Sequence, residues 1–122
     1  MPARFVVVHD DAGFTSALMR RFGSDVVWFD DPSRALKALE SAQSIRFLIT
    51  RVQFADGQPL GLSLARLAKS ARPDIRVVFT GSHQHREYTV GLGEFVPEPA
   101  DPIHVGMLME WVSEHPGSGT GN

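Results

Sequence analysis

Short runs of apolar residues alternate with helical patterns along this chain, and this alternation limits the fold more than any other feature. Segments with apolar residues three or four positions apart follow each run and predict helices. Strands that alternate with helices form βαβ units and a parallel sheet that is buried on both faces. The sequence therefore predicts an α/β fold of five strands and five helices. The strand-like runs lie at 5–8, 26–29, 47–50, 75–79 and 94–96.

Capping residues mark where the predicted helices begin and end. Asp11 can cap a helix that closes at Gly23, a candidate for the left-handed conformation. Asp31 and Asp101 each precede a proline, a combination typical of helix starts. Ser82 can cap a helix over 83–90. The apolar positions that we assign to the last helix are Ile103, Val105, Met107, Leu108, Trp111 and Val112.

Size and composition indicate one ordinary globular domain. The chain has 122 residues and no cysteine, which excludes disulfides and thiol chemistry. We expect the domain to span 1–113 and the Gly/Ser-rich segment 114–122 to be a flexible tail. The net charge of −2 does not indicate the basic surface that binds nucleic acid. No apolar stretch approaches the roughly 20 residues that cross a bilayer. Because the first residues also lack a signal-peptide pattern, we expect a cytoplasmic protein that binds neither nucleic acid nor membrane.

Polar residues follow three of the predicted strands, at the points where those strands end. His9, Asp10 and Asp11 follow the first strand, Arg51 follows the third and Thr80 follows the fourth. In an open α/β sheet, ligands bind beyond the carboxyl ends of the strands, near the point where strand order reverses. We therefore expect these side chains to share one pocket, whose chemistry is set by the cation Arg51.

These strand ends resemble those of the receiver domains of two-component response regulators, and the resemblance extends over nearly the whole chain. It implies a flavodoxin-like (CheY-like), doubly wound sheet with five parallel strands in the order 2-1-3-4-5. Receivers hold a magnesium ion in an acidic cluster after the first strand and accept a phosphoryl group on an aspartate that ends the third. A Thr or Ser follows their fourth strand, and a lysine before a proline follows the fifth. The matching segments are Val7-Val8-His9-Asp10-Asp11, Leu48-Ile49-Thr50-Arg51-Val52, Asp56-Gly57, Val78-Phe79-Thr80-Gly81 and Phe95-Val96-Pro97-Glu98-Pro99.

The sequence departs from the receiver pattern at the two positions that matter most. Arg51 stands where the phosphoacceptor aspartate is expected, and Glu98 stands where the lysine is expected. His9 also replaces one of the usual acidic residues. A guanidinium offers no lone pair for attack on phosphorus, so Arg51 cannot accept a phosphoryl group. We predict a degenerate receiver, or pseudo-receiver, in which Arg51 substitutes for the metal, pairs with Asp10, Asp11 or both, and forms an ion pair with Glu98.

Each of these pocket residues also has a plainer interpretation. Arg51 can be a surface residue in a loop, Asp11 a helix cap and Glu98 a solvated charge. His9 is more often a polar residue satisfied at a strand end than a pH sensor. Asp10 and Asp11 are weak candidates for metal ligands, but a fixed guanidinium charge would repel a cation there. We expect no cofactor and no bound Mg²⁺.

The resemblance also implies an output side. Thr80 and Phe95 occupy the places of the hydroxyl and the aromatic side chain that move together on phosphorylation in receivers. Without a phosphoryl group to favour one state over another, we expect a single locked state. In receivers the face of the fourth helix, fifth strand and fifth helix mediates dimerisation and partner binding. For Trp111 and Met107 a core position is favoured over that role, although aromatic and Met residues are common in interfaces. The candidate partner face is Tyr88, Phe95, Met109 and Trp111.

The sequence favours a non-enzymatic signalling module of a two-component phosphorelay. We expect it to act through contacts with signalling proteins or a second copy of itself, independently of phosphorylation. Two alternatives stay open: a receiver that accepts a phosphoryl group on Asp10, Asp11 or Asp56, and a flavodoxin-like domain in which Arg51 holds a small anion. The sequence contains no Walker loop, nucleophile elbow or zinc-ligand spacing, so no motif points to an enzyme.

Overall fold

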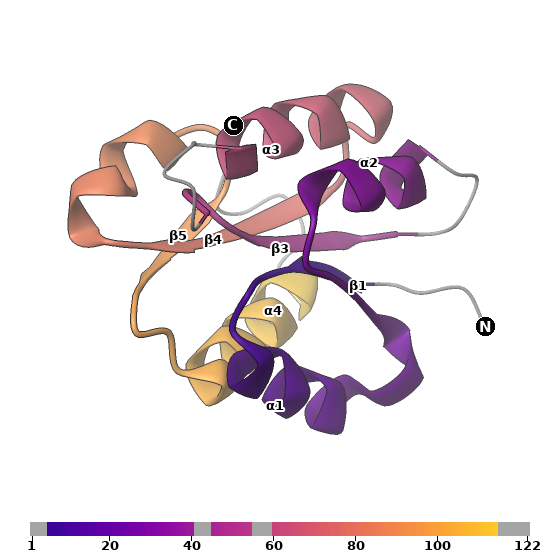
Figure 1. Cartoon of the computed structure of the whole chain (residues 1–122), viewed down its shortest axis with the longest axis vertical. Helices are drawn as coiled ribbons and strands as arrows, with labels where there is room; N and C mark the ends of the chain where they lie inside the picture. The colour runs from indigo at the N-terminus through magenta and orange to yellow at the C-terminus, as the bar shows by residue number, and fades with distance from the viewer. Residues whose placement is uncertain (1–4, 41–44, 55–59, 115–122) are drawn as a thin grey trace.

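The computed structural model describes residues 5–40, 45–54 and 60–114. Within these residues, parallel strands form one five-stranded sheet in the order β2-β1-β3-β4-β5. Figure 1 shows this sheet between two layers of helices. The predicted flavodoxin-like, doubly wound α/β fold and its strand order are therefore confirmed. The strands are β1 (Phe5–Val8), β2 (Val26–Phe29), β3 (Phe47–Arg51), β4 (Arg76–Gly81) and β5 (Glu94–Pro97).

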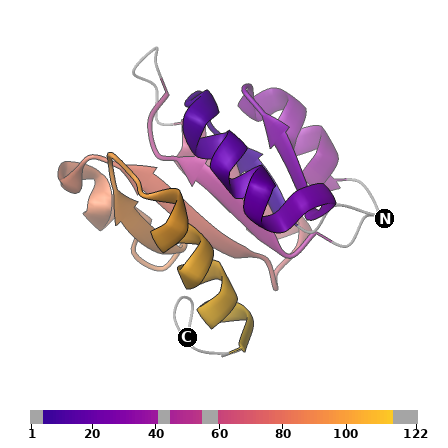
Figure 2. The same ribbon diagram turned by 90° about the horizontal axis from the view of Figure 1, so that it is seen from below.

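The helices divide between the two faces of the sheet. Those that follow β1 and β5 cover one face, and those that follow β2 and β3 cover the other, as Figures 1 and 2 show from two directions. Short 3-10 segments join α1 to β2 and β4 to β5. The helical elements are α1 (Ala12–Phe22), η1 (Gly23–Asp25), α2 (Pro32–Glu40), α3 (Leu60–Ala71), η2 (His83–Thr89) and α4 (Pro102–Glu114).

The core consists of two apolar clusters, one on each face of the sheet. Alternate residues of a strand point to opposite faces, so Val6 and Val8 belong to the cluster under α2 and α3. Phe5 and Val7 belong to the cluster under α1 and α4. The strands therefore need apolar side chains at every position, because both faces are covered. This explains why their sequences are continuous apolar runs.

Predicted caps begin three of the four α-helices. Asp11 accepts a hydrogen bond from the backbone N–H of Phe14 at the start of α1. Asp31 and Asp101 accept from the N–H groups two residues further on, at the starts of α2 and α4. Gly23 follows α1 with a φ of 61°, which favours glycine, but its ψ of −134° differs from the left-handed conformation that we predicted. Local sequence therefore sets these boundaries.

The predicted helix over 83–90 is a 3-10 segment, η2, in the structure. Ser82 precedes it but makes no side-chain capping hydrogen bond. The segment does not continue as an α-helix, because Val90 is extended and Gly91 has a φ of 82°. This prediction was therefore right about the position of the segment and wrong about its type and its cap.

The predicted inner face of α4 was partly wrong. Val105 and Met109 are buried against the sheet, with Met109 only 1% exposed. Met107 and Trp111, for which a core position was favoured, are 60% and 47% exposed, and Ile103 also faces outward. Both sets repeat every four residues, so spacing alone could not distinguish the inner stripe from the outer one.

None of the helices in the described part of the chain has the length and apolar character needed to cross a membrane. α4 continues through Glu114, and the predicted tail from residue 115 onward lies outside the described residues.

Candidate functional site

The carboxyl ends of β1, β3, β4 and β5 meet at one edge of the sheet and bring the predicted pocket residues together. Arg51 is the last residue of β3 and lies beside Thr80 of β4 in the strand register. His9 follows β1 directly, and its N–H donates to the carbonyl of Phe29 on β2. Glu98 follows β5, and its N–H donates to the carbonyl of Gly81, extending the β4–β5 pairing by one residue. The backbone pairing of the strands is therefore enough to bring these side chains close together.

Close packing of α3 against β3 supports the backbone at Arg51. Gly61 lies in the first turn of α3, and a Cβ at this position would overlap the carbonyl oxygen of Arg51. The N–H of Gly61 donates to the carbonyl of Val52 at 3.2 Å. Thr50, which is fully buried, donates its hydroxyl to the same Arg51 carbonyl at 3.0 Å. Contacts to the backbone carbonyls thus fix the end of β3, which carries the Arg51 side chain.

The Arg51 guanidinium forms the centre of the pocket. Its Nε and Nη2 donate to the two carboxylate oxygens of Glu98 at 2.7 and 2.8 Å, a bidentate pair. Its Nη1 donates to Asp10 Oδ1 at 2.8 Å. The Arg51 and Glu98 side chains are 26% and 22% exposed, so the pair is mostly shielded from bulk water. The predicted ion pair between Arg51 and Glu98 is therefore present in the structure.

His9 lies beneath this pair and connects it to the start of α1. The Asp11 N–H donates to His9 Nδ1 at 3.0 Å. Because an amide can only donate, Nδ1 carries no proton, and the imidazole is neutral with its proton on Nε2. This nitrogen lies 3.2 Å from Thr80 Oγ1, and the Thr80 hydroxyl donates to Glu98 Oε2 at 3.2 Å. A directional chain of hydrogen bonds therefore runs from the Asp11 amide to the Glu98 carboxylate.

The electrostatics of the pocket follow from burial and pairing. The pKa of Arg51 is raised, chiefly by its hydrogen bond to Glu98, with Asp10 adding to the effect and burial opposing it. The pKa of His9 is lowered, chiefly because only 4% of the residue is exposed and burial disfavours the imidazolium. The carboxylate of Glu98 opposes this shift, and the charge of Arg51 adds to it. Arg51 therefore stays charged and His9 neutral.

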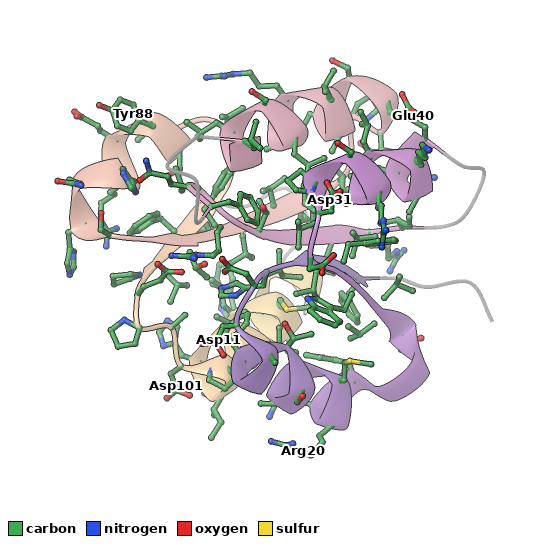
Figure 3. All side chains as sticks on the ribbon, in the orientation of Figure 1. Asp11, Arg20, Asp31, Glu40, Tyr88 and Asp101 are labelled. Carbon is green, nitrogen blue, oxygen red and sulfur yellow. The ribbon has the colours of Figure 1, made fainter. Side chains whose placement is uncertain are left out.

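The side chain of Asp11 lies apart from the Arg51 network, although its backbone N–H donates to His9. Its carboxylate accepts from the Phe14 N–H, so its side chain caps α1 and does not pair with Arg51 in any described contact. Figure 3 shows Asp11 at the start of α1, with Asp101 at the start of α4. The interpretation of Asp11 as a helix cap is therefore the one that its side chain follows. Asp56, the third carboxylate considered as a phosphoacceptor, lies outside the described residues.

The contacts of the two aspartates disfavour a divalent metal ion beside Arg51. Asp10 Oδ1 accepts from Arg51, and Asp11 Oδ1 accepts from the N–H of Phe14, so each carboxylate has one oxygen engaged. A cation bound to Asp10 would lie close to the guanidinium charge and be repelled by it. Among the described residues, no group of three His, Asp or Glu side chains is arranged to hold a metal. The absence of bound Mg²⁺ therefore stays a prediction.

The predicted output residues lie in different environments. Thr80 is fully buried and takes part in the hydrogen-bond chain. Phe95 is partly buried against the core, and the guanidinium of Arg86 lies 5.0 Å from its ring centre. Tyr88 is exposed on η2, away from α1 in Figure 3. The assignment of Met109 to the partner face was wrong, because its side chain is buried between α4 and the sheet.

Sequence reasoning missed two aromatic neighbours of the pocket. The Trp28 indole N–H donates to the His9 carbonyl at 2.7 Å. The Phe14 ring stacks on the His9 ring with the centroids 4.5 Å apart. Phe14 was assignable to an inner helix stripe, but nothing in a single sequence indicates which strand-end residue it covers. The contact of Trp28 with His9 depends on the pairing of β2 with β1, which the sequence around Trp28 does not show.

No protein-family model matches the sequence, and the search of curated proteins finds no match. The structure does resemble solved structures. A response regulator receiver protein from Sinorhizobium medicae WSM419 aligns with a TM-score of 0.76 and 18% identity, covering 93% of this chain and 95% of that one. A two component transcriptional regulator AraC from Clostridium phytofermentans ISDg aligns with a TM-score of 0.72 and 21% identity, covering 93% and 96%. For the receiver domain of NtrX from Brucella abortus the TM-score is 0.74 and the identity 20%, covering 90% and 98%.

These alignments show that the chain has the fold of response regulator receiver domains over nearly its whole length. The resemblance in the sequence is therefore confirmed at the level of the fold. At these identities the likeness reaches no further than the fold. The chemistry of the pocket follows from this chain's own residues, above all Arg51 and Glu98.

Proposed function

We propose that this chain is a receiver-like signalling module of a two-component system that works through protein contacts and does not accept a phosphoryl group. The receiver fold supports the signalling class. The absence of a nucleophile at the end of β3 supports independence from phosphorylation, because Arg51 has no lone pair to offer. The observation that carries the proposal is the bidentate pair of Arg51 with Glu98, which engages two guanidinium nitrogens and both carboxylate oxygens.

The state of the other carboxylates disfavours the rival phosphoacceptors. Asp10 is bound to the guanidinium and Asp11 caps α1. Either would have to give up its contact to attack a phosphorus atom, and no metal would be there to neutralise the developing charge. Phosphorylation at either position would therefore break one stabilising interaction.

Exposed apolar side chains support binding to proteins. Ile103, Met107 and Trp111 form a stripe on the outer side of α4, and Tyr88 and Val90 are exposed at and after η2. Exposed apolar side chains grouped on one side of a helix are typical of interaction surfaces. We infer that the outer side of α4 is a surface for signalling partners or for a second copy of the chain, and that η2 with Tyr88 is a separate one. The stripe on α4 then replaces Met109 in the predicted partner face.

Incubation with acetyl phosphate and Mg²⁺, followed by intact-mass spectrometry, tests the proposal. An active receiver domain treated in parallel serves as the positive control. We expect the control to gain the mass of one phosphoryl group and this chain to gain none. A phosphoryl adduct on any aspartate of this chain would contradict the proposal, and peptide mapping would then identify Asp10, Asp11 or Asp56 as its site.

A further inference from the structure

The Glu98 carboxylate is bound in the way that proteins bind an anionic ligand. Oε2 accepts from Arg51 Nε at 2.7 Å and from the Thr80 hydroxyl at 3.2 Å. Oε1 accepts from Arg51 Nη2 at 2.8 Å. A planar guanidinium fork that donates to both oxygens of one anion is the arrangement that selects carboxylate and phosphate groups.

The donors and the anion belong to different parts of the scaffold. Arg51 and Thr80 are neighbours on the central strands β3 and β4, and Thr80 is fully buried. Glu98 instead follows the edge strand β5, at the start of the segment that leads to α4. Its side chain is 22% exposed, and Pro99 after it is exposed. The donors therefore belong to the two interior strands, whereas the anion follows the edge strand and precedes a solvent-exposed residue.

We propose that Arg51 and Thr80 form an oxyanion site that Glu98 fills from within the same chain, and that a small carboxylate or phosphate ligand occupies the site when Glu98 leaves it. This inference rests on the proposed function in one respect, because both start from the pairing of Arg51 with Glu98. Glu98 is then a tethered competitor for the ligand. Its tether gives it a high effective concentration, so wild-type protein binds free oxyanions weakly.

Asp10 sets a preference among such ligands. It accepts from the third guanidinium nitrogen, Nη1, at 2.8 Å, and so neutralises part of the positive charge. The site that Glu98 fills therefore faces one guanidinium and one nearby carboxylate. A singly charged carboxylate matches Glu98 in shape and charge, whereas the second charge of phosphate would have only the partly neutralised guanidinium to pair with, so the carboxylate is favoured.

Chemical rescue of Glu98→Ala tests the proposal. Sodium acetate and sodium phosphate are titrated separately against sodium chloride of equal ionic strength. Thermal unfolding and the NMR resonance of the Arg51 Nε–H are followed. We expect acetate to raise the unfolding temperature and shift the resonance saturably, with phosphate binding more weakly. In the matched control Arg51→Gln/Glu98→Ala, acetate affinity should fall about tenfold or more, because the charge-assisted fork is gone.

Two results would overturn the proposal: no effect of acetate beyond that of chloride, or equal acetate binding with and without Arg51. Glu98→Gln keeps the side-chain volume and serves if the alanine variant does not fold. Its neutral amide should be displaced by acetate about tenfold more readily than the wild-type carboxylate. Equal acetate affinity of Glu98→Gln and wild type would likewise overturn the proposal. None of these results bears on the phosphorylation test, which uses the wild-type chain.

Discussion

At the scale of single residues, one guanidinium divides its donors between two carboxylates that approach from different strands. Arg51 binds Glu98 through two nitrogens and Asp10 through the third. Exposed ion pairs contribute about 0–1 kcal/mol, and removing one partner of a buried pair costs about 3–5 kcal/mol. The Arg51–Glu98 pair is about a quarter exposed and bidentate, so it lies between these limits.

A double-mutant cycle with Arg51→Gln and Glu98→Gln measures this pair. We expect a coupling free energy of about 1–2 kcal/mol from urea unfolding. The matched control is the more exposed pair Arg21–Glu110, which joins α1 to α4 through one hydrogen bond. Its coupling should stay below about 1 kcal/mol. A coupling at Arg51–Glu98 no larger than that of the control would show that the guanidinium is solvated and that the pocket is not closed by it.

Burial of His9 makes stability depend on pH. Its pKa is lowered in the folded state, whereas the unfolded chain keeps the ordinary value of 6.5. The unfolded state therefore binds the proton more readily, and the free energy of unfolding falls as the pH drops through 6.5 towards the lower folded pKa. Above 6.5 the contribution is fully present. The slope is at most about 1.4 kcal/mol per pH unit for one proton.

Urea unfolding between about pH 5 and pH 8 checks this expectation. His9→Gln removes the titrating group and should flatten the profile near pH 6, even where the variant is less stable at every pH. His83→Gln, a substitution of an exposed histidine, is the control and should leave the profile unchanged. A wild-type profile that already lacks a slope below pH 6.5 would mean that His9 keeps its ordinary pKa in the folded state.

Residue-level prediction succeeded where a strand end and a residue type together defined the chemistry. The convergence of Arg51, Glu98 and Asp10 followed from parallel strands that share one edge, and these residues do pair. The sequence left open whether Asp11 caps a helix or joins the pocket, because one carboxylate after a strand can do either. The structure shows its side chain capping α1.

At the scale of elements, α4 shows why a helix that is apolar on all sides is difficult to orient from sequence. Two stripes with the same spacing of four compete for the sheet, and the buried one is Val105 and Met109. The distinction depends on how the helix axis lies over β5 and β4, which is a tertiary property. A similar difficulty explains why η2 was predicted as an α-helix. The sequence marks where the segment begins, but it does not show whether the hydrogen bonds follow the α or the 3-10 pattern.

Paired alanine variants on α4 test this orientation. Met109→Ala should lower the free energy of unfolding by about 2–5 kcal/mol, because it leaves a cavity among Val7, Val78 and Val105 of the same cluster. Met107→Ala should change it by less than about 0.5 kcal/mol, because its side chain faces solvent. Thermal or urea denaturation measures both. Equal costs would indicate that the helix is rotated from the described orientation.

At the scale of the whole molecule, the alternation of apolar strands and capped helices predicted the parallel sheet and the edge that carries the site. The strand order came from the resemblance to receiver domains, and the structure has that order, β2-β1-β3-β4-β5. The proposed partner surface was harder to predict, because no single-sequence pattern separates an exposed apolar stripe from a buried one. Trp111 belonged to the predicted partner face, but the exposure of Ile103 and Met107 on the same side of α4 emerged only from the packed structure.

The proposed charge reversal involves two strand ends of the sheet. Arg51 ends β3, Glu98 follows β5, and the two side chains pair, so a test of the proposal changes both positions. We expect Arg51→Asp alone to restore little metal or phosphate-mimic binding, because Glu98 would repel an anionic group. Arg51→Asp/Glu98→Lys should restore both. Full binding by the single variant would show that Glu98 has no influence on the pocket.

The most direct test of the closed pocket is an NMR titration of wild type and of the Arg51→Asp/Glu98→Lys variant with beryllofluoride and Mg²⁺. We predict saturable shifts of the Asp10, residue 51 and Thr80 amides in the double variant, with no saturable shifts in wild type. Saturable shifts of these amides in the wild-type protein would contradict the claim that Arg51 and its two carboxylate partners close the site to metal and phosphoryl groups.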